Sequence, residues 1–169
     1  MTWRANNAAV VACSSWVEAR TTVNRLIEAG YDPQKVSVAA RLCSSNGDSI
    51  ACYSLAGRTE GWGDDGRFWA ALWRTLSGRG VFVLPSYGPV LVAGPLVEWV
   101  ARALNNAGIF DGFSAVGAAL YGIGLSRDVV PELEAALDAR NFLVVIYGSS
   151  KEVEQAGSVL AVEELSDAA

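Results

Sequence analysis

Residues 81–104 read VFVLPSYGPVLVAGPLVEWVARAL and open the most apolar segment of this 169-residue chain. The whole segment, residues 81–125, contains only three charged residues, Glu98, Arg102 and Asp111, but seven glycines and three prolines. A segment with so few charges is expected to be buried, either in the protein's own core or against a partner. The sequence therefore favours packing and assembly, rather than acid/base chemistry, as the basis of function.

This segment forms most of a predicted helical insert, residues 67–125. Glycines recur through the insert, and small residues at such spacing let helices approach one another closely. Pro95 suits the first turn of a helix, where its missing N–H costs nothing. The expected elements are a helix over 67–76, a turn over 85–89, a helix that starts near Val90 or Pro95 and ends at Leu104, and a glycine-punctuated helical stretch up to Leu125.

The sequence before the insert predicts alternating strands and helices. Apolar residues 8–13 form an expected strand, and the tetrapeptide SWVE at 15–18 is a capping box that starts a helix. Gly30 stands where a left-handed C-cap would end that helix. Further strands are predicted over residues 36–40 and 50–55, followed by a glycine-rich loop.

The sequence after the insert predicts a helix, a strand and a second helix. Ser126 is the expected N-cap of a helix over 127–139. Residues 142–147, FLVVIY, are apolar on both faces, which favours a central position in a sheet. Residues 148–150 are expected to cap the last helix, and the chain from 163 onward is expected to be frayed or weakly extended.

Together these elements predict an α+β fold in a single domain, residues 1–169. We expect a ferredoxin-like split sandwich, βαβ in a first half over 8–55 and αβα in a second half over 126–169. The apolar, Gly/Pro-rich helical insert, 67–125, interrupts it.

Four stretches of the chain resemble a known family. They are LIEAGY at 26–31, FWAALW at 68–73, VLPSYGPVLVAGPL at 83–96, and the block from GIGL at 122–125 to VV at 144–145. In this order they resemble the bacterial general-stress-protein family of the heat-induced YflT and 17M type. The resemblance implies a small intracellular bacterial protein that is linked to stress and has no assigned catalytic residues. The chain departs from the family pattern at Ser86-Tyr87, where Gly-Leu is usual, and at Leu125-Ser126, which replaces Ile-Pro.

The composition excludes several classes of function. The chain has no histidine, which removes the commonest general base and metal ligand and the usual serine-hydrolase triad. Its net charge of -5 and scattered Lys and Arg residues argue against nucleic-acid binding. Cys13, Cys43 and Cys52 lack the CxxC spacing of a zinc site and are expected to be reduced thiols. We therefore predict no catalytic residue, no metal and no cofactor.

A glycine-rich loop, GWGDDG at 61–66, matches the G-x-G-x-x-G pattern of dinucleotide-binding loops. It does not follow the first strand of a βαβ unit, and the adjacent carboxylates of Asp64 and Asp65 would repel phosphate. Two carboxylates also fall far short of the six to eight oxygens that Ca²⁺ prefers. We interpret this loop as a helix-capping or flexible connection.

Aromatic residues gather around the insert, and Trp and Tyr are favoured anchors of protein interfaces. With 51% hydrophobic residues and a mean hydropathy of +0.26, the chain is apolar for a soluble monomer. An aromatic belt at a membrane surface is an alternative, but prolines and polar residues interrupt both apolar stretches. The predicted interface residues are Trp69, Trp73, Pro85, Tyr87, Pro95, Trp99 and Phe113.

The sequence thus predicts a non-enzymatic, stress-associated protein that self-assembles as a homo-oligomer through the insert. The first residues lack the long apolar run of a signal peptide, so we expect a cytoplasmic location. One alternative is a membrane-associated protein whose insert enters the bilayer. A second alternative is a binder of a small apolar ligand in a pocket between sheet and insert.

Overall fold

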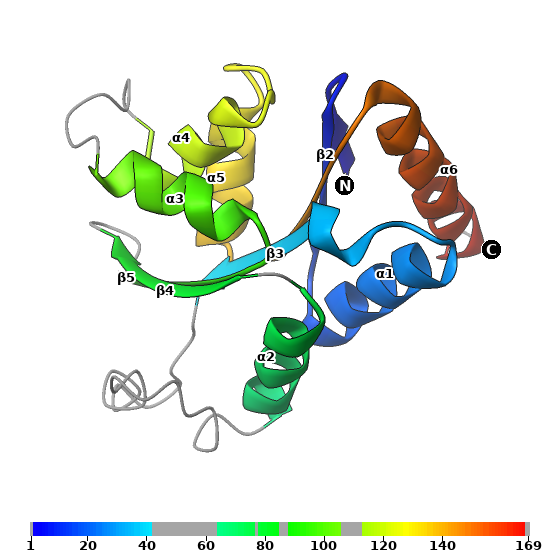
Figure 1. Cartoon of the computed structure of the whole chain (residues 1–169), viewed down its shortest axis with the longest axis horizontal. Helices are drawn as coiled ribbons and strands as arrows, with labels where there is room; N and C mark the ends of the chain where they lie inside the picture. Colours follow the sequence, from blue (N-terminus) through cyan, green and yellow to red (C-terminus); the bar gives the residue numbers. More distant parts are fainter. Residues whose placement is uncertain (1, 42–63, 77, 85–87, 106–112, 168–169) are drawn as a thin grey trace.

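The computed structural model describes residues 2–41, 64–76, 78–84, 88–105 and 113–167. They form an α+β fold in which helices cover both faces of one sheet (Figure 1). The strands are β1 (Thr2–Arg4), β2 (Ala8–Cys13), β3 (Val36–Arg41), β4 (Arg79–Leu84), β5 (Gly88–Ala93) and β6 (Phe142–Tyr147). The helices are α1 (Trp16–Glu28), α2 (Asp64–Thr75), α3 (Leu96–Asn105), α4 (Ala115–Gly122), α5 (Val130–Asp138) and α6 (Ser150–Asp167), with a 3-10 turn, η1, at Pro33–Lys35.

The sheet has the order β1-β2-β6-β3-β5-β4, and each neighbouring pair is antiparallel. Strands β2 and β3 are joined through α1 but lie on either side of β6, which makes a split βαβ unit. Strands β5 and β6, joined through α3, α4 and α5, lie on either side of β3 in the same way. The central position predicted for residues 142–147 is confirmed.

The two connections cover opposite faces of the sheet. Helix α1 packs with α2 and α6 on one face, and α3, α4 and α5 pack on the other. The strands β2 and β3 run antiparallel to β5 and β6, and the two units cross the sheet in opposite directions. Since their helices also lie on opposite faces, the two crossovers have opposite hands, although right-handed crossovers are the rule. A ferredoxin-like arrangement is therefore not confirmed, and the coarser prediction of an α+β fold is.

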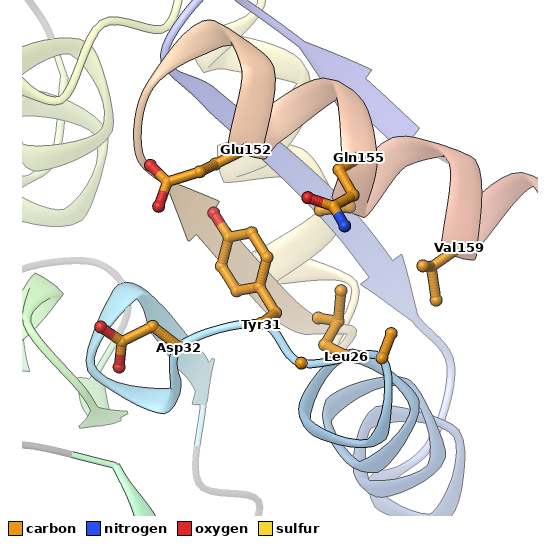
Figure 2. A pocket seen from close by; sticks show the side chains of 9 residues that line it. Leu26, Tyr31, Asp32, Glu152, Gln155 and Val159 are labelled. Atoms are coloured by element: carbon orange, nitrogen blue, oxygen red, sulfur yellow. The ribbon is translucent and has the colours of Figure 1, made fainter.

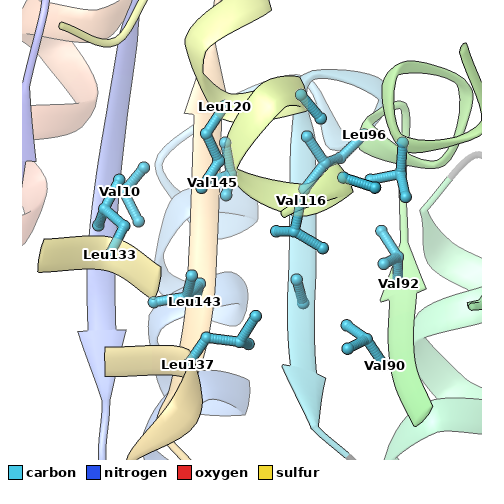
Figure 3. Packing of buried hydrophobic residues seen from close by; sticks show 14 of the residues in the cluster. Val10, Val90, Val92, Leu96, Val116, Leu120, Leu133, Leu137, Leu143 and Val145 are labelled. Carbon is cyan, nitrogen blue, oxygen red and sulfur yellow. The ribbon is translucent and has the colours of Figure 1, made fainter. Parts of the chain in front are cut away.

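Alternation along the strands supplies a core to each face. In β6, Val144 and Ile146 face α1 and α6, whereas Leu143 and Val145 face the other helical layer. Figure 3 shows the second layer, where α4 and α5 pack against the sheet through large aliphatic side chains. Its labelled residues are Val10, Val90, Val92, Leu96, Val116, Leu120, Leu133, Leu137, Leu143 and Val145.

Local signals fix α1 as predicted. The Ser15 hydroxyl accepts a hydrogen bond from the Glu18 N–H at 3.2 Å, and the Glu18 carboxylate accepts one from the Ser14 N–H at 2.7 Å. Gly30, with a φ of 88°, ends the helix in the left-handed region. The capping box and the glycine C-cap are both confirmed.

The prediction that the insert is helical throughout is wrong. Within residues 67–125 the strands β4 and β5 form a hairpin that joins the main sheet, so that β5 lies between β3 and β4. Alternate residues of β5 are buried against opposite helical layers, and such a doubly buried strand has no polar face to reveal its period. A helix from Val90 is thus wrong, whereas a helix start just after Pro95 is confirmed.

Three further boundaries differ from the prediction. Helix α2 begins at Asp64, inside the stretch predicted as a loop, and not at residue 67. Helix α5 begins at Val130, not at Arg127, and Val129 rather than Ser126 occupies its N-cap. The Ser126 carbonyl instead accepts hydrogen bonds from the N–H groups of Val129 and Val130 in a preceding turn. Helix α6 continues to Asp167, where the sequence predicted a frayed or extended end. The strand predicted over 50–55 lies outside the described residues.

Candidate functional site

The predicted interface residues do not form one surface. Trp69 and Trp73 lie on α2, which packs on the same face of the sheet as α1. Trp99 lies on α3, which packs on the opposite face. Half-buried Phe113 stands just before α4 on that second side, and half-buried Pro95 just before α3. Pro85 and Tyr87 lie outside the described residues.

Trp69 is a core residue. Its side chain is only 1% exposed, and its ring lies 5.5 Å from that of Phe68 and 6.4 Å from that of Phe142 on β6. The neighbouring Trp73 is half-buried and donates from Nε1 to the Val92 carbonyl at 3.3 Å. The apolar character of α2 is therefore explained by packing of α2 on its own sheet.

Aromatic side chains do gather on the outside of α3 and α4. The rings of Phe113 and Tyr121 lie 6.2 Å apart, and Tyr121 is 51% exposed. The Arg102 guanidinium lies 5.5 Å from the Trp99 ring centroid. Arg102 also pairs with Glu98 at 4.0 Å, and both side chains are exposed. An exposed pair of this kind contributes little to stability.

The outer edge of β4 is a second candidate surface, and no described residue pairs with it. Its register with β5 runs unbroken from Arg79 opposite Ala93 to Leu84 opposite Gly88, so the described pairing contains no bulge. Val81 is 40% exposed. The interface residues predicted from the sequence do not include this edge, although the run VFVL at 81–84, which has no charge, was available as a signal.

The most polar cluster lies where η1 meets the start of α6. The Lys35 ammonium donates to the Glu152 carboxylate at 2.6 Å, and the same carboxylate accepts from the Ser149 N–H at 2.8 Å. These hydrogen bonds, that of Lys35 foremost, lower the pKa of Glu152 to about 2. Tyr31 donates to the Tyr147 carbonyl at 3.0 Å, and burial raises the pKa of its hydroxyl to about 12. Figure 2 shows the Tyr31 hydroxyl pointing toward Glu152.

Two cavities flank this cluster. A small one of about 130 Å³ is bounded by α1 and α6 and includes Leu26, Tyr31 and Gln155 (Figure 2). A more open one of about 560 Å³ lies where residues of α3 and α4 meet the end of β6. Its lining residues are Asn7, Lys35, Trp99, Gly122, Ile123, Tyr147, Gly148, Ser149 and Glu152.

The Lys35–Glu152 pair makes stability depend on pH in the acid range. Because the folded-state pKa of Glu152 is about 2, below its ordinary value of 4.5, the carboxylate stabilises the folded chain above pH 4.5. This contribution is lost as pH falls from about 4.5 to about 2. We expect the urea midpoint of Glu152→Gln to fall less steeply across this window than that of the native chain. Identical slopes would show that the ion pair does not contribute.

No described group of three or more Cys, Asp or Glu residues is placed to hold a metal ion. Among the described helices, none combines the length and apolarity needed to cross a bilayer. Cys13 is buried, with its sulfur 3.7 Å from the Thr22 hydroxyl, whereas Cys43 and Cys52 lie outside the described residues.

Comparison of the chain with protein-family models, curated proteins and solved structures finds no match. The resemblance to a general-stress-protein family therefore stays a prediction.

Proposed function

We propose that this chain is a non-enzymatic, stress-associated protein that self-associates through its 67–125 segment. The observation that carries the self-association is the outer edge of β4, which belongs to this segment. The stress association and the cytoplasmic location rest on the family resemblance. A ferredoxin-like relationship of the sheet belongs to the same proposal, since β2, α1 and β3 form a split βαβ unit around β6.

An open edge strand is a template for another strand, because its backbone N–H and C=O groups have no partner. Proteins that avoid such pairing place charges, prolines or bulges on the edge or keep the edge strand short. Strand β4 has six residues, its register is unbroken, and its single charge, Arg79, lies at its first residue. The opposite edge, β1, has only three residues and ends on the exposed Arg4. Within the part of the chain that the structure describes, the two edges thus differ in length and in protection, and β4 is the less protected.

The non-enzymatic part of the proposal is supported by the chemistry of the side chains. The chain has no histidine. Lys35 and Glu152 belong to the polar cluster and also line the larger cavity, and the Lys35 ammonium lies 2.6 Å from the Glu152 carboxylate. A general acid or base needs a pKa near the working pH, whereas the pKa of Glu152 is about 2.

The molar mass in solution tests the self-association. Light scattering behind size-exclusion chromatography, run over a series of protein concentrations, should give a multiple of 17.8 kDa at the higher concentrations. A mass of 17.8 kDa at every concentration would contradict the proposal. The stress association is tested separately, by the abundance of the protein in its host before and after heat shock. An unchanged abundance would contradict that part.

A second candidate function is the binding of a small amphiphilic ligand, and the larger cavity favours it. Its lining combines apolar Trp99 and Ile123 of the 67–125 segment with polar Lys35 and Asn7. Anilinonaphthalene sulfonate, which combines an aromatic body with an anionic group, is a suitable probe. Its fluorescence should rise on binding, and Ile123→Asp should abolish the rise. An equal rise with that variant would exclude this cavity.

A further inference from the structure

We propose that two copies of the chain pair through their β4 strands, antiparallel, around a two-fold axis that passes beside Val81. The two six-stranded sheets would then form one continuous sheet. This inference rests on the proposed self-association and names the surface that carries it. The occupant of the β4 edge is a second copy because an antiparallel edge is complementary to itself under a two-fold axis.

The axis must be perpendicular to the sheet, since only then do two antiparallel edges meet with like faces on the same side. Val81 lies opposite Leu91 of β5, which faces α1 and α2, and Phe82 lies opposite Val90, which faces α3 and α4. Successive residues of β4 therefore face opposite helical layers. Residues directly opposite each other across the new pair must share a face, so the axis passes beside a residue and not between two. The overlap is greatest beside the two middle residues of β4, Val81 and Phe82.

Packing within the chain selects Val81. A Cβ atom on Gly80 would lie 2.7 Å from Cε2 of Phe82, so the Phe82 ring already covers Gly80 of its own strand. Val81 is 40% exposed, so its side chain has apolar surface that a second copy can bury. In the register centred on Val81, each Gly80 lies opposite the partner's Phe82, so the two Phe82 rings do not meet at the axis.

The charges on the edge permit this register. Arg79 is the only charged residue of β4, and its guanidinium lies 6.0 Å from the Trp73 ring centroid. In the register centred on Val81, Arg79 lies opposite the partner's Val83, so four residues separate it from the partner's Arg79 along the strands. At about 3.4 Å per residue this is about 14 Å, beyond the ~8 Å screening length at physiological salt. The two arginines therefore repel each other weakly.

The size of the contact sets its strength. Two paired edges of six residues each cover less than the roughly 1,600 Å² of a standard protein interface. We therefore expect a dimer that dissociates on dilution.

Disulfide trapping tests the register. In a chain whose native cysteines, Cys13, Cys43 and Cys52, are replaced by alanine, Val81→Cys should form a covalent dimer under mild oxidation. Val17→Cys is the matched control, because Val17 is 46% exposed but lies on α1. It should form little dimer under the same conditions. Equal trapping at both positions would overturn the proposed pairing.

A charge on the edge separates this inference from the proposed function. Val81→Lys places a cation beside its own copy at the axis, and should reduce the mass at high concentration to 17.8 kDa. Val17→Lys should keep the native mass. A native chain that is monomeric at every concentration would overturn both proposals. A native oligomer that Val81→Lys leaves intact would overturn the β4 pairing alone. If Trp99→Lys then abolished that oligomer, the interface would lie on the layer formed by α3, α4 and α5.

Discussion

Gly94→Ala is expected to lower the free energy of unfolding by about 2 to 5 kcal/mol. Gly94 has a φ of 97°, a left-handed conformation that costs an alanine about 1 to 2 kcal/mol. An added Cβ would also overlap the Val36 carbonyl oxygen and lie 2.8 Å from the Ser37 Cα, and overpacking of this kind costs about 1 to 3 kcal/mol more. These are backbone atoms of a central strand, so they cannot move aside as a flexible side chain would.

The position of Gly94 explains why the effect should be large. It joins β5 to α3, its N–H donates to the Gly78 carbonyl at 3.0 Å, and the Leu96 N–H at the start of α3 donates to the Ser37 hydroxyl at 3.0 Å. Urea unfolding followed by circular dichroism measures the loss. Gly30→Ala is the matched control, because Gly30 also has a positive φ of 88° but no atom lies within 4 Å of its added Cβ. An equal loss in both variants would show that the close approach to β3 contributes nothing.

Trp69→Ala is expected to lower the free energy of unfolding by about 3 to 5 kcal/mol, the usual cost of removing a buried aromatic side chain. The Trp69 side chain fills the space between α2 and the sheet, in ring contact with Phe68, Trp73 and Phe142. Urea unfolding again measures the effect. Trp99→Ala, at a half-buried position on the other face, should cost clearly less.

This prediction also decides between two roles of Trp69. The sequence placed Trp69 at an interface between copies, where truncation would change the oligomer and leave the fold intact. The structure places it in the core of one chain. If Trp69→Ala keeps its native stability and loses only self-association, the interface role is correct and the core role is wrong.

The sequence predicts most accurately those elements whose signals are local. The capping box at 15–18 and Gly30 define α1, and the apolar run at 142–147 defines the central strand β6. The signals of α1 depend on hydrogen bonds and backbone conformations within a few residues of the helix. The β6 run is buried on both faces, as β5 is, but it is short and lies between the turn residues Asn141 and Gly148. These signals are therefore visible before the rest of the fold is known.

The prediction of a helical insert is wrong because the signals in this segment depend on the tertiary fold. Residues 88–93 are buried on both faces in β5, so their apolar run is equally compatible with a buried helix. Trp69 and Trp99 are thirty positions apart in one apolar segment, yet the sheet separates them. No periodicity in the sequence reveals that separation, because it follows from the insertion of β5 beside β3.

Amide hydrogen exchange in β4, measured below and above the concentration at which the mass increases, tests the central claim most directly. The amides of alternate β4 residues point away from β5 and exchange readily in the monomer. We predict that their exchange slows as the dimer forms, whereas the exchange of α1 amides around Val17 stays the same. A mass that increases while the exchange of β4 amides stays unchanged would contradict assembly through this edge.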